Sequence, residues 1–168
     1  MTNQRVAGLV WKFSDGVPLI LTHQPAKSPG IEDYSVTTVT GTLNENENGF
    51  SAMAKAMRDC FGIDRGLIIT EQAMSKTMES LDKEYRWYFM QVDSSTRIDP
   101  CPNEIQDYRW SPPPELPQVI ENMRAGRRFM FEQALSEACE RNLLSRKLFP
   151  FLQEQIETKL MSSTPAQT

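Results

Sequence analysis

The residue types and spacing that could do chemistry are concentrated in one stretch, Gly41 to Ile63. It carries Glu47, Lys55 and Asp59, two carboxylates and an amine that a loop followed by a helix would place around one mouth. A Mg²⁺ ion bound to a phosphorylated ligand usually takes one or two protein carboxylates together with phosphate oxygens. The stretch therefore predicts a loop–helix that handles phosphate and a divalent metal ion.

The chain around this stretch supplies the elements that must position these side chains. Residues 35–40 are rich in β-branched types and lead into Gly41, and residues 44–49 are polar and turn-like. Asn48 is a suitable N-cap for a helix that we expect from about residue 49 to 61, and Glu47 suits the positive end of its dipole. Gly62 is a good residue to end this helix.

The predicted helix has a core side and a second side. At about 100° per residue, the core side carries Met53, Met57 and Phe61. The second side broadly carries Ala52, Ala56, Asp59 and Cys60. An aspartate between an alanine and a cysteine is a small set of donors for a metal ion.

The pattern of this stretch resembles the Nudix box, Gly-x5-Glu-x7-Arg-Glu-U-x-Glu-Glu-x-Gly-U, in which U is an aliphatic residue. Gly41 and Glu47 match its opening, Lys55 stands at the arginine, and the spacing is intact to the end. The remaining counterparts are Ala56 at the first glutamate, Met57 at the aliphatic position, Asp59 and Cys60 at the adjacent glutamates, and Gly62 with Ile63 at the final pair. The resemblance covers roughly residues 6–144 and implies a Nudix-like α/β/α sandwich with a mixed sheet.

The resemblance also implies a reaction, the hydrolysis of a pyrophosphate bond in a nucleoside diphosphate derivative with Mg²⁺ or Mn²⁺ as cofactor. Here Ala56 has no ligating atom and Cys60 prefers softer metals, so Asp59 is the one metal carboxylate left on the helix. Glu104 and Asp107 lie where some members of the family place a further acid. The candidate catalytic residues are therefore Glu47, Lys55, Asp59 and Glu104, and the candidate metal ligands are Asp59 and Glu104.

Four residues are candidates for contacting a ligand. Gly41 opens the box, and Tyr34 and Trp87 could stack on a base, with packing in the core as the alternative for these aromatic rings. Arg127 belongs to a basic group that could meet phosphate, with a solvated helix face as the favoured alternative. His23 is the single histidine of the chain, and we expect it in a partly exposed loop.

A second resemblance concerns two short runs. Residues 35–43 are similar to a Val-Thr-Gly-Ser stretch of the dihydroneopterin triphosphate and dATP pyrophosphatases. Arg127, Arg128 and residues 131–134 are loosely similar to the C-terminal helix of the same enzymes. These runs are too short to assign a substrate.

The whole chain predicts an α/β sandwich in which helices cover both faces of a mixed sheet. The order is strands, helix, strands and then helices. The first two strands form a hairpin across an Asp-Gly turn. We expect strands at Val6–Phe13, Val17–Thr22, Ser35–Thr40, Leu67–Thr70, Glu84–Val92 and Glu104–Trp110, and further helices at Leu116–Met123, Phe129–Leu144 and Leu148–Leu160. In the strand from residue 84, Tyr85, Trp87 and Phe89 share one face, and Tyr88 and Met90 share the other.

Length and composition indicate a single Nudix-like domain over residues 1–160, followed by a frayed tail over residues 161–168. The formal net charge of -4 argues against general nucleic-acid binding, and no segment has the length of a membrane span. Three cysteines without a CxxC pair fit a reducing, cytoplasmic location rather than a disulfide framework. Among them, Cys60 is expected to be a small buried residue.

Three functions remain open on the sequence. The first is a metal-dependent hydrolase of a nucleoside diphosphate derivative with a reduced set of metal ligands. The second is a catalytically inactive Nudix-like domain that binds a nucleotide-type small molecule or a protein partner. The third is a homodimeric scaffold without a small ligand.

Overall fold

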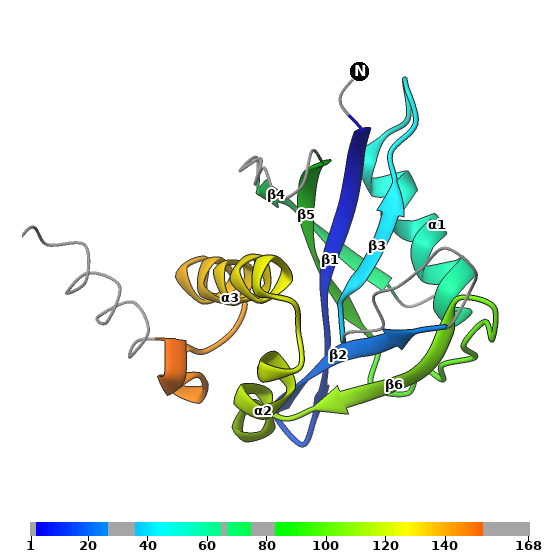
Figure 1. Ribbon diagram of the computed structural model, residues 1–168. Coiled ribbons are helices and arrows are strands. Elements are labelled where there is room, and N and C mark those ends of the chain that lie inside the picture. The colour runs from blue at the N-terminus through cyan, green and yellow to red at the C-terminus, as the bar shows by residue number, and fades with distance from the viewer. Residues whose placement is uncertain (1–2, 27–35, 65–66, 75–82, 153–168) are drawn as a thin grey trace, which may run out of the picture.

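The fold is built on a six-stranded mixed sheet (Figure 1). The computed structural model describes residues 3–26, 36–64, 67–74 and 83–152. The strands are β1 (Asn3–Ser14), β2 (Val17–Pro25), β3 (Val39–Thr42), β4 (Leu67–Met74), β5 (Lys83–Val92) and β6 (Ile105–Ser111). Their order is β4-β5-β1-β2-β6, and β3 pairs with the first part of β1. The β1–β5 ladder is parallel and the other ladders are antiparallel.

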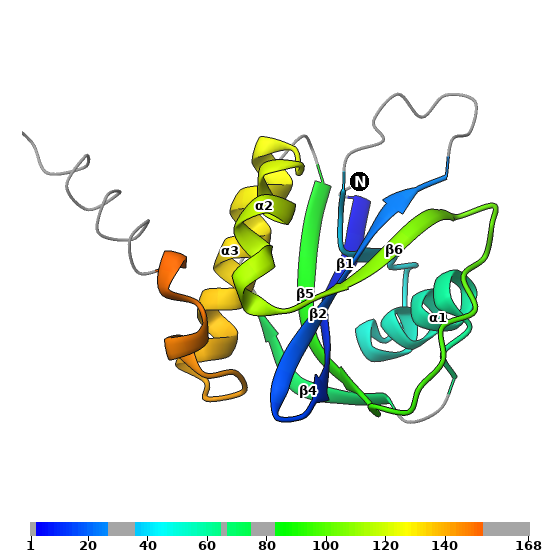
Figure 2. The same cartoon turned by 90° about the horizontal axis from the view of Figure 1, so that it is seen from below.

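Helices cover both faces of this sheet, as Figures 1 and 2 show. Helix α1 (Gly49–Phe61) lies on one face. Helices α2 (Leu116–Glu121) and α3 (Ala125–Glu140) lie on the other, with the short 3-10 helices η1 (Pro113–Glu115) and η2 (Arg146–Leu148). The predicted α/β sandwich is confirmed. Within the described residues, no helix is both long and apolar enough to cross a membrane.

The alternation of β5 divides the protein into two cores. Tyr85, Trp87 and Phe89 pack in the cluster beneath α2 and α3. Tyr88 and Met90 pack with α1 in the second cluster. Because successive side chains of a strand point to opposite faces, one aromatic strand can serve both layers. The predicted division of this strand is confirmed.

The hairpin between β1 and β2 also forms as expected. Asp15 and Gly16 have φ angles of 50° and 78°, the left-handed values that a two-residue type I′ turn needs. The turn places Ser14 opposite Val17, and the ladder continues to the pair of Trp11 with Ile20. Beyond this pair, β1 instead pairs with β3, and β2 pairs with β6.

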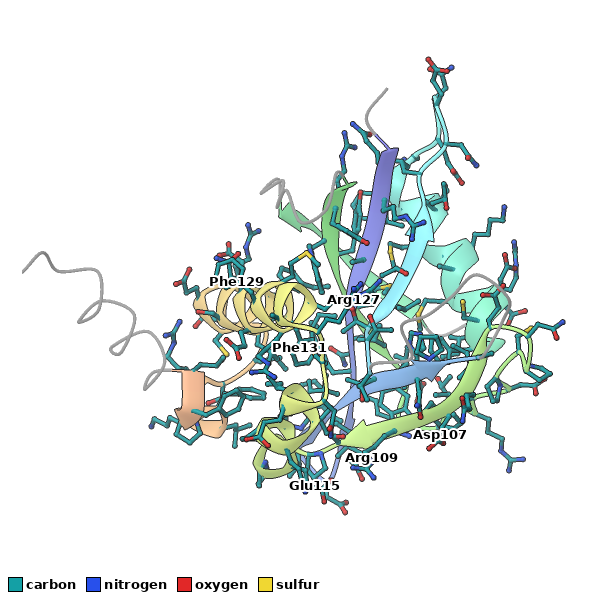
Figure 3. The ribbon with its side chains drawn as sticks, viewed as in Figure 1. Asp107, Arg109, Glu115, Arg127, Phe129 and Phe131 are labelled. Carbon is teal, nitrogen blue, oxygen red and sulfur yellow. The ribbon has the colours of Figure 1, made fainter. Side chains whose placement is uncertain are left out.

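The predicted bounds of the long C-terminal helix need correction. Helix α3 begins at Ala125 rather than Phe129 and ends at Glu140 rather than Leu144, and Phe129 is 37% exposed (Figure 3). The buried positions are Met130, Phe131 and Leu135, whose spacing follows the helical period and excludes residue 129. The predicted helix over residues 148–160 and the tail over residues 161–168 lie mostly or wholly outside the described residues.

Candidate functional site

The loop before α1 is ordered by its own polar side chains. The Glu47 carboxylate accepts a hydrogen bond from the backbone N–H of Asn44 at 3.0 Å, which closes the loop on itself. The Asn48 side chain accepts from the N–H of Phe50 at 2.8 Å and caps the helix, as predicted. Glu47 is therefore held in the loop at the start of α1, half-buried.

The C-terminal end of α1 is joined to a distant segment of the chain. Gly62 has a φ angle of 67° and closes the helix through bonds from Gly62 N–H to Arg58 and from Ile63 N–H to Met57. The N–H groups of Asp99 and Cys101 donate to the carbonyl oxygens of Phe61 and Cys60, both at 2.9 Å. This contact brings the start of β6, with Glu104, to the end of the helix.

Ala56, which stands at the first helix glutamate of the Nudix box, is covered by other residues. Ala56 is buried with 8% exposure, and Ala52 is buried beside it. A Cβ atom built on Gly41 would lie 3.2 Å from the Ala56 Cβ and 3.6 Å from the Ala52 carbonyl oxygen. Strand β3 thus passes directly over the helix here, which is why Ala52 and Ala56 are buried along with the predicted core residues Met53 and Met57.

Asp59 and Cys60 occupy the other two glutamate positions of the box, and only Asp59 supplies a carboxylate. Asp59 is about half exposed, and its Oδ1 lies 3.6 Å from Nε of Arg58. Cys60 is only half-buried, which corrects the expectation that it is buried. Burial, and then the carboxylates of Glu104 and Asp59, raise the pKa of the Cys60 thiol to about 11. At neutral pH it is therefore a thiol, which is a poor metal ligand.

The donor set does not fit the metal that the resemblance implies. Among the residues that the structure describes, no group of three or more His, Cys, Asp or Glu side chains could hold a metal ion. Asp59 and Glu104 both influence Cys60, so they lie at the same end of α1, but they complete no such group.

The residues predicted to contact a ligand do not lie together at one surface. Trp87 is 3% exposed and lines a small cavity of about 10 Å³ with Thr37, Thr38 and Arg127, the room of one water molecule. Arg127 reaches from α3 and donates a hydrogen bond to the hydroxyl of Thr37 (Figure 3). The favoured alternative of a solvated helix face is wrong for Arg127, which is half-buried. Tyr34 lies outside the described residues.

His23 is not in a loop. It lies in β2 with 8% exposure, and its ring packs edge-on against Phe61 at 5.4 Å between centroids. Its pairing with Tyr108 belongs to the β2–β6 ladder, so β2 runs further than the sequence predicted. The backbone of Thr37 also pairs with His23 through two bonds of 2.9 Å. Burial, and then the positive charge of Arg127, lower the pKa of His23 to about 4. The imidazole is therefore neutral at pH 7.

The sequence analysis missed a polar pocket of about 190 Å³ between β2, β6 and α2. The register pairs Thr22 with Arg109 and Gln24 with Asp107, so these four side chains share the face that α2 partly covers. Asn122, just after α2, also lines the pocket, and Figure 3 shows Asp107 and Arg109 along β6. The alternation Asp-Tyr-Arg in β6 is a sequence signal for a polar face, but it does not identify the partner strand or the helix above it.

The fold of this chain was compared with known protein sequences and structures. No protein-family model and no curated protein matches the sequence. Among solved structures, a Nudix hydrolase from M. smegmatis, RenU, superposes with a TM-score of 0.65 at 14% identity, covering 83% of this chain and 87% of that chain. The chain has the Nudix fold. Residues 41–63, whose pattern resembles the Nudix box, form a loop and α1 within this fold.

Two further structures with the Nudix fold show how widely it is shared. The NUDIX domain of NrtR from Shewanella oneidensis, complexed with ADP ribose, has a TM-score of 0.58 at 12% identity, with 82% of this chain and 88% of that one covered. The dihydroneopterin triphosphate pyrophosphohydrolase of E. coli has a TM-score of 0.55 at 15% identity, with 77% and 92% covered. Its TM-score is lower than those of the other two, so the likeness does not single out that enzyme's substrate.

Proposed function

We propose that this Nudix-fold protein binds a nucleotide-type small molecule, a nucleoside diphosphate derivative, without efficient cleavage. The observation that carries the proposal is the contrast within the loop–helix. Its framework is complete, with Glu47 closing the loop, Asn48 capping α1 and Gly62 ending it. Its metal-ligand positions are not, because Ala56 is buried without a donor atom and Cys60 is a protonated thiol.

The likeness to solved structures supports a nucleotide-type ligand, since one of them is a NUDIX domain complexed with ADP ribose. A cytoplasmic location and a homodimer remain predictions from the sequence.

The second candidate function is hydrolysis of the pyrophosphate bond with Mg²⁺ or Mn²⁺. It is favoured by one observation, that the carboxylates of Asp59 and Glu104 lie at the same end of α1. Loss of a single well-placed electrostatic stabiliser typically slows an enzyme by about 100-fold or more, so turnover would be slow. Glu47 and Lys55 would then keep the supporting roles that the resemblance gives them.

One experiment separates the two functions. Purified protein is titrated calorimetrically with ADP-ribose, dNTPs, dinucleoside polyphosphates and NADH, and the same mixtures are assayed for released phosphate or pyrophosphate with Mg²⁺ or Mn²⁺. Binding without release supports the proposal. Metal-dependent release that is abolished by Asp59→Asn and retained by Glu115→Gln, an exposed carboxylate on η1, supports the second candidate. Absence of binding to every compound overturns both.

A further inference from the structure

The charge of α1 is reversed relative to the box that it resembles. The six positions Arg-Glu-U-x-Glu-Glu carry one arginine and three glutamates, so they are negative without a metal ion. The corresponding residues here are Lys55, Ala56, Met57, Arg58, Asp59 and Cys60, two cationic side chains and one anionic one. These six positions therefore carry more cationic than anionic side chains.

The cationic side chains are available to a ligand. Lys55 is exposed, and among the described residues it has no ion pair. It precedes Ala56, the residue that Gly41 covers, and lies one helical turn before Asp59 on the same edge of α1. Arg58 is also exposed, with 60% of its side chain accessible, and its contact with Asp59 is a loose one of 3.6 Å.

A diphosphate needs positive charge from its binding site, and a divalent ion supplies it only where carboxylates hold that ion. Here Asp59 is the one carboxylate at the three helix positions, and the amine of Lys55 and the guanidinium of Arg58 are present. These groups bind phosphate oxygens directly through charge-assisted hydrogen bonds. We propose that the diphosphate of the ligand binds directly to Lys55 and Arg58, independently of any divalent metal ion. This inference rests on the proposed function.

The first test measures the affinity for ADP-ribose by calorimetry in two buffers, one with Mg²⁺ and one with EDTA. We expect dissociation constants that agree within about 2-fold, and about 10-fold weaker binding by Lys55→Gln in both buffers, as expected for a hydrogen bond to a charged group. The matched control is Lys147→Gln. Lys147 is an exposed lysine in η2, on the opposite side of the sheet from α1, and its replacement should leave the affinity unchanged.

The second test uses Asp59→Asn, for which the two modes of binding predict opposite signs. In direct binding, Asp59 repels the diphosphate and competes for Arg58, so its neutralisation should strengthen binding about 2- to 3-fold. In metal-mediated binding, the same change removes a ligand and weakens binding. Far-UV circular dichroism and thermal unfolding confirm that each variant is folded.

The outcomes separate this inference from the function on which it rests. Binding that occurs only with Mg²⁺, or that Asp59→Asn weakens, overturns direct binding and leaves the proposed function intact. Failure of ADP-ribose and the other nucleotide compounds to bind in both buffers overturns the proposed function itself. Equal affinity in both buffers, with loss in Lys55→Gln but not in Lys147→Gln, supports direct binding.

Discussion

Replacing Gly62 by alanine should destabilise the protein by about 2 to 3 kcal/mol, for two reasons that can be separated. The first is conformational, because Gly62 has a φ angle of 67° and a side chain in this left-handed region costs about 1 to 2 kcal/mol. The second is steric. A Cβ at Gly62 would lie 3.0 Å from the carbonyl oxygen of Asp99 and 3.1 Å from its Cβ.

The steric part is not easily relieved, because the first of these neighbours is backbone. The segment that contains Asp99 is tied to the end of α1 by the bonds from Asp99 to Phe61 and from Cys101 to Cys60. We expect the alanine to push this segment away from the helix, which adds about 1 kcal/mol to the conformational cost.

Gly16 is the matched control. Its φ angle is 78°, close to that of Gly62, but no heavy atom lies within 4 Å of a Cβ built there. Gly16→Ala should therefore carry the conformational cost alone. The assay is urea unfolding at 25 °C followed by far-UV circular dichroism, with Gly62→Ala expected to lower the free energy of unfolding by about 1 kcal/mol more than Gly16→Ala. Equal losses in the two variants would refute the idea that the contact with Asp99 holds the helix end.

Three further predictions concern the loop, the histidine and the thiol. Glu47→Ala should lower the free energy of unfolding by about 1 kcal/mol in urea titrations, because the N–H of Asn44 loses its acceptor, whereas Glu47→Gln should lose less. His23 has a pKa of about 4 in the folded protein and about 6.5 in the unfolded chain, so the unfolded state binds more protons between these values and stability falls as the pH falls. Because of this residue, the free energy of unfolding should be about 2 kcal/mol lower at pH 5 than at pH 7. This contribution should vanish in His23→Gln. With a pKa of about 11, Cys60 should react with iodoacetamide at pH 8 about 100-fold more slowly than an ordinary thiol, as measured by mass spectrometry, and an ordinary rate would contradict its burial.

The features that the sequence predicted correctly depend on residues close together along the chain. The hairpin follows from Asp15 and Gly16, which adopt the left-handed conformations of its turn. The limits of α1 follow from the Asn48 cap and the Gly62 terminator. The spacing of the box predicts a loop followed by a helix, and its resemblance predicts the Nudix fold that the structure has. In each case the stabilising contact spans only a few residues, so it can be recognised from local pattern.

The surroundings of the candidate ligand-binding residues depend on contacts between distant parts of the chain. Arg127 meets Thr37 across 90 residues, and this approach turns an expected surface arginine into a half-buried one. His23 pairs with Tyr108 of β6, which makes that histidine part of a strand, and Thr37 bridges it from the other side. The polar pocket exists because the register of β2 with β6 sets Asp107 beside Gln24 under α2. The sequence by itself determined which residue types occupy the Nudix loop–helix. Only the tertiary structure decided which of them are open to a ligand, because burial depends on what packs above each side chain.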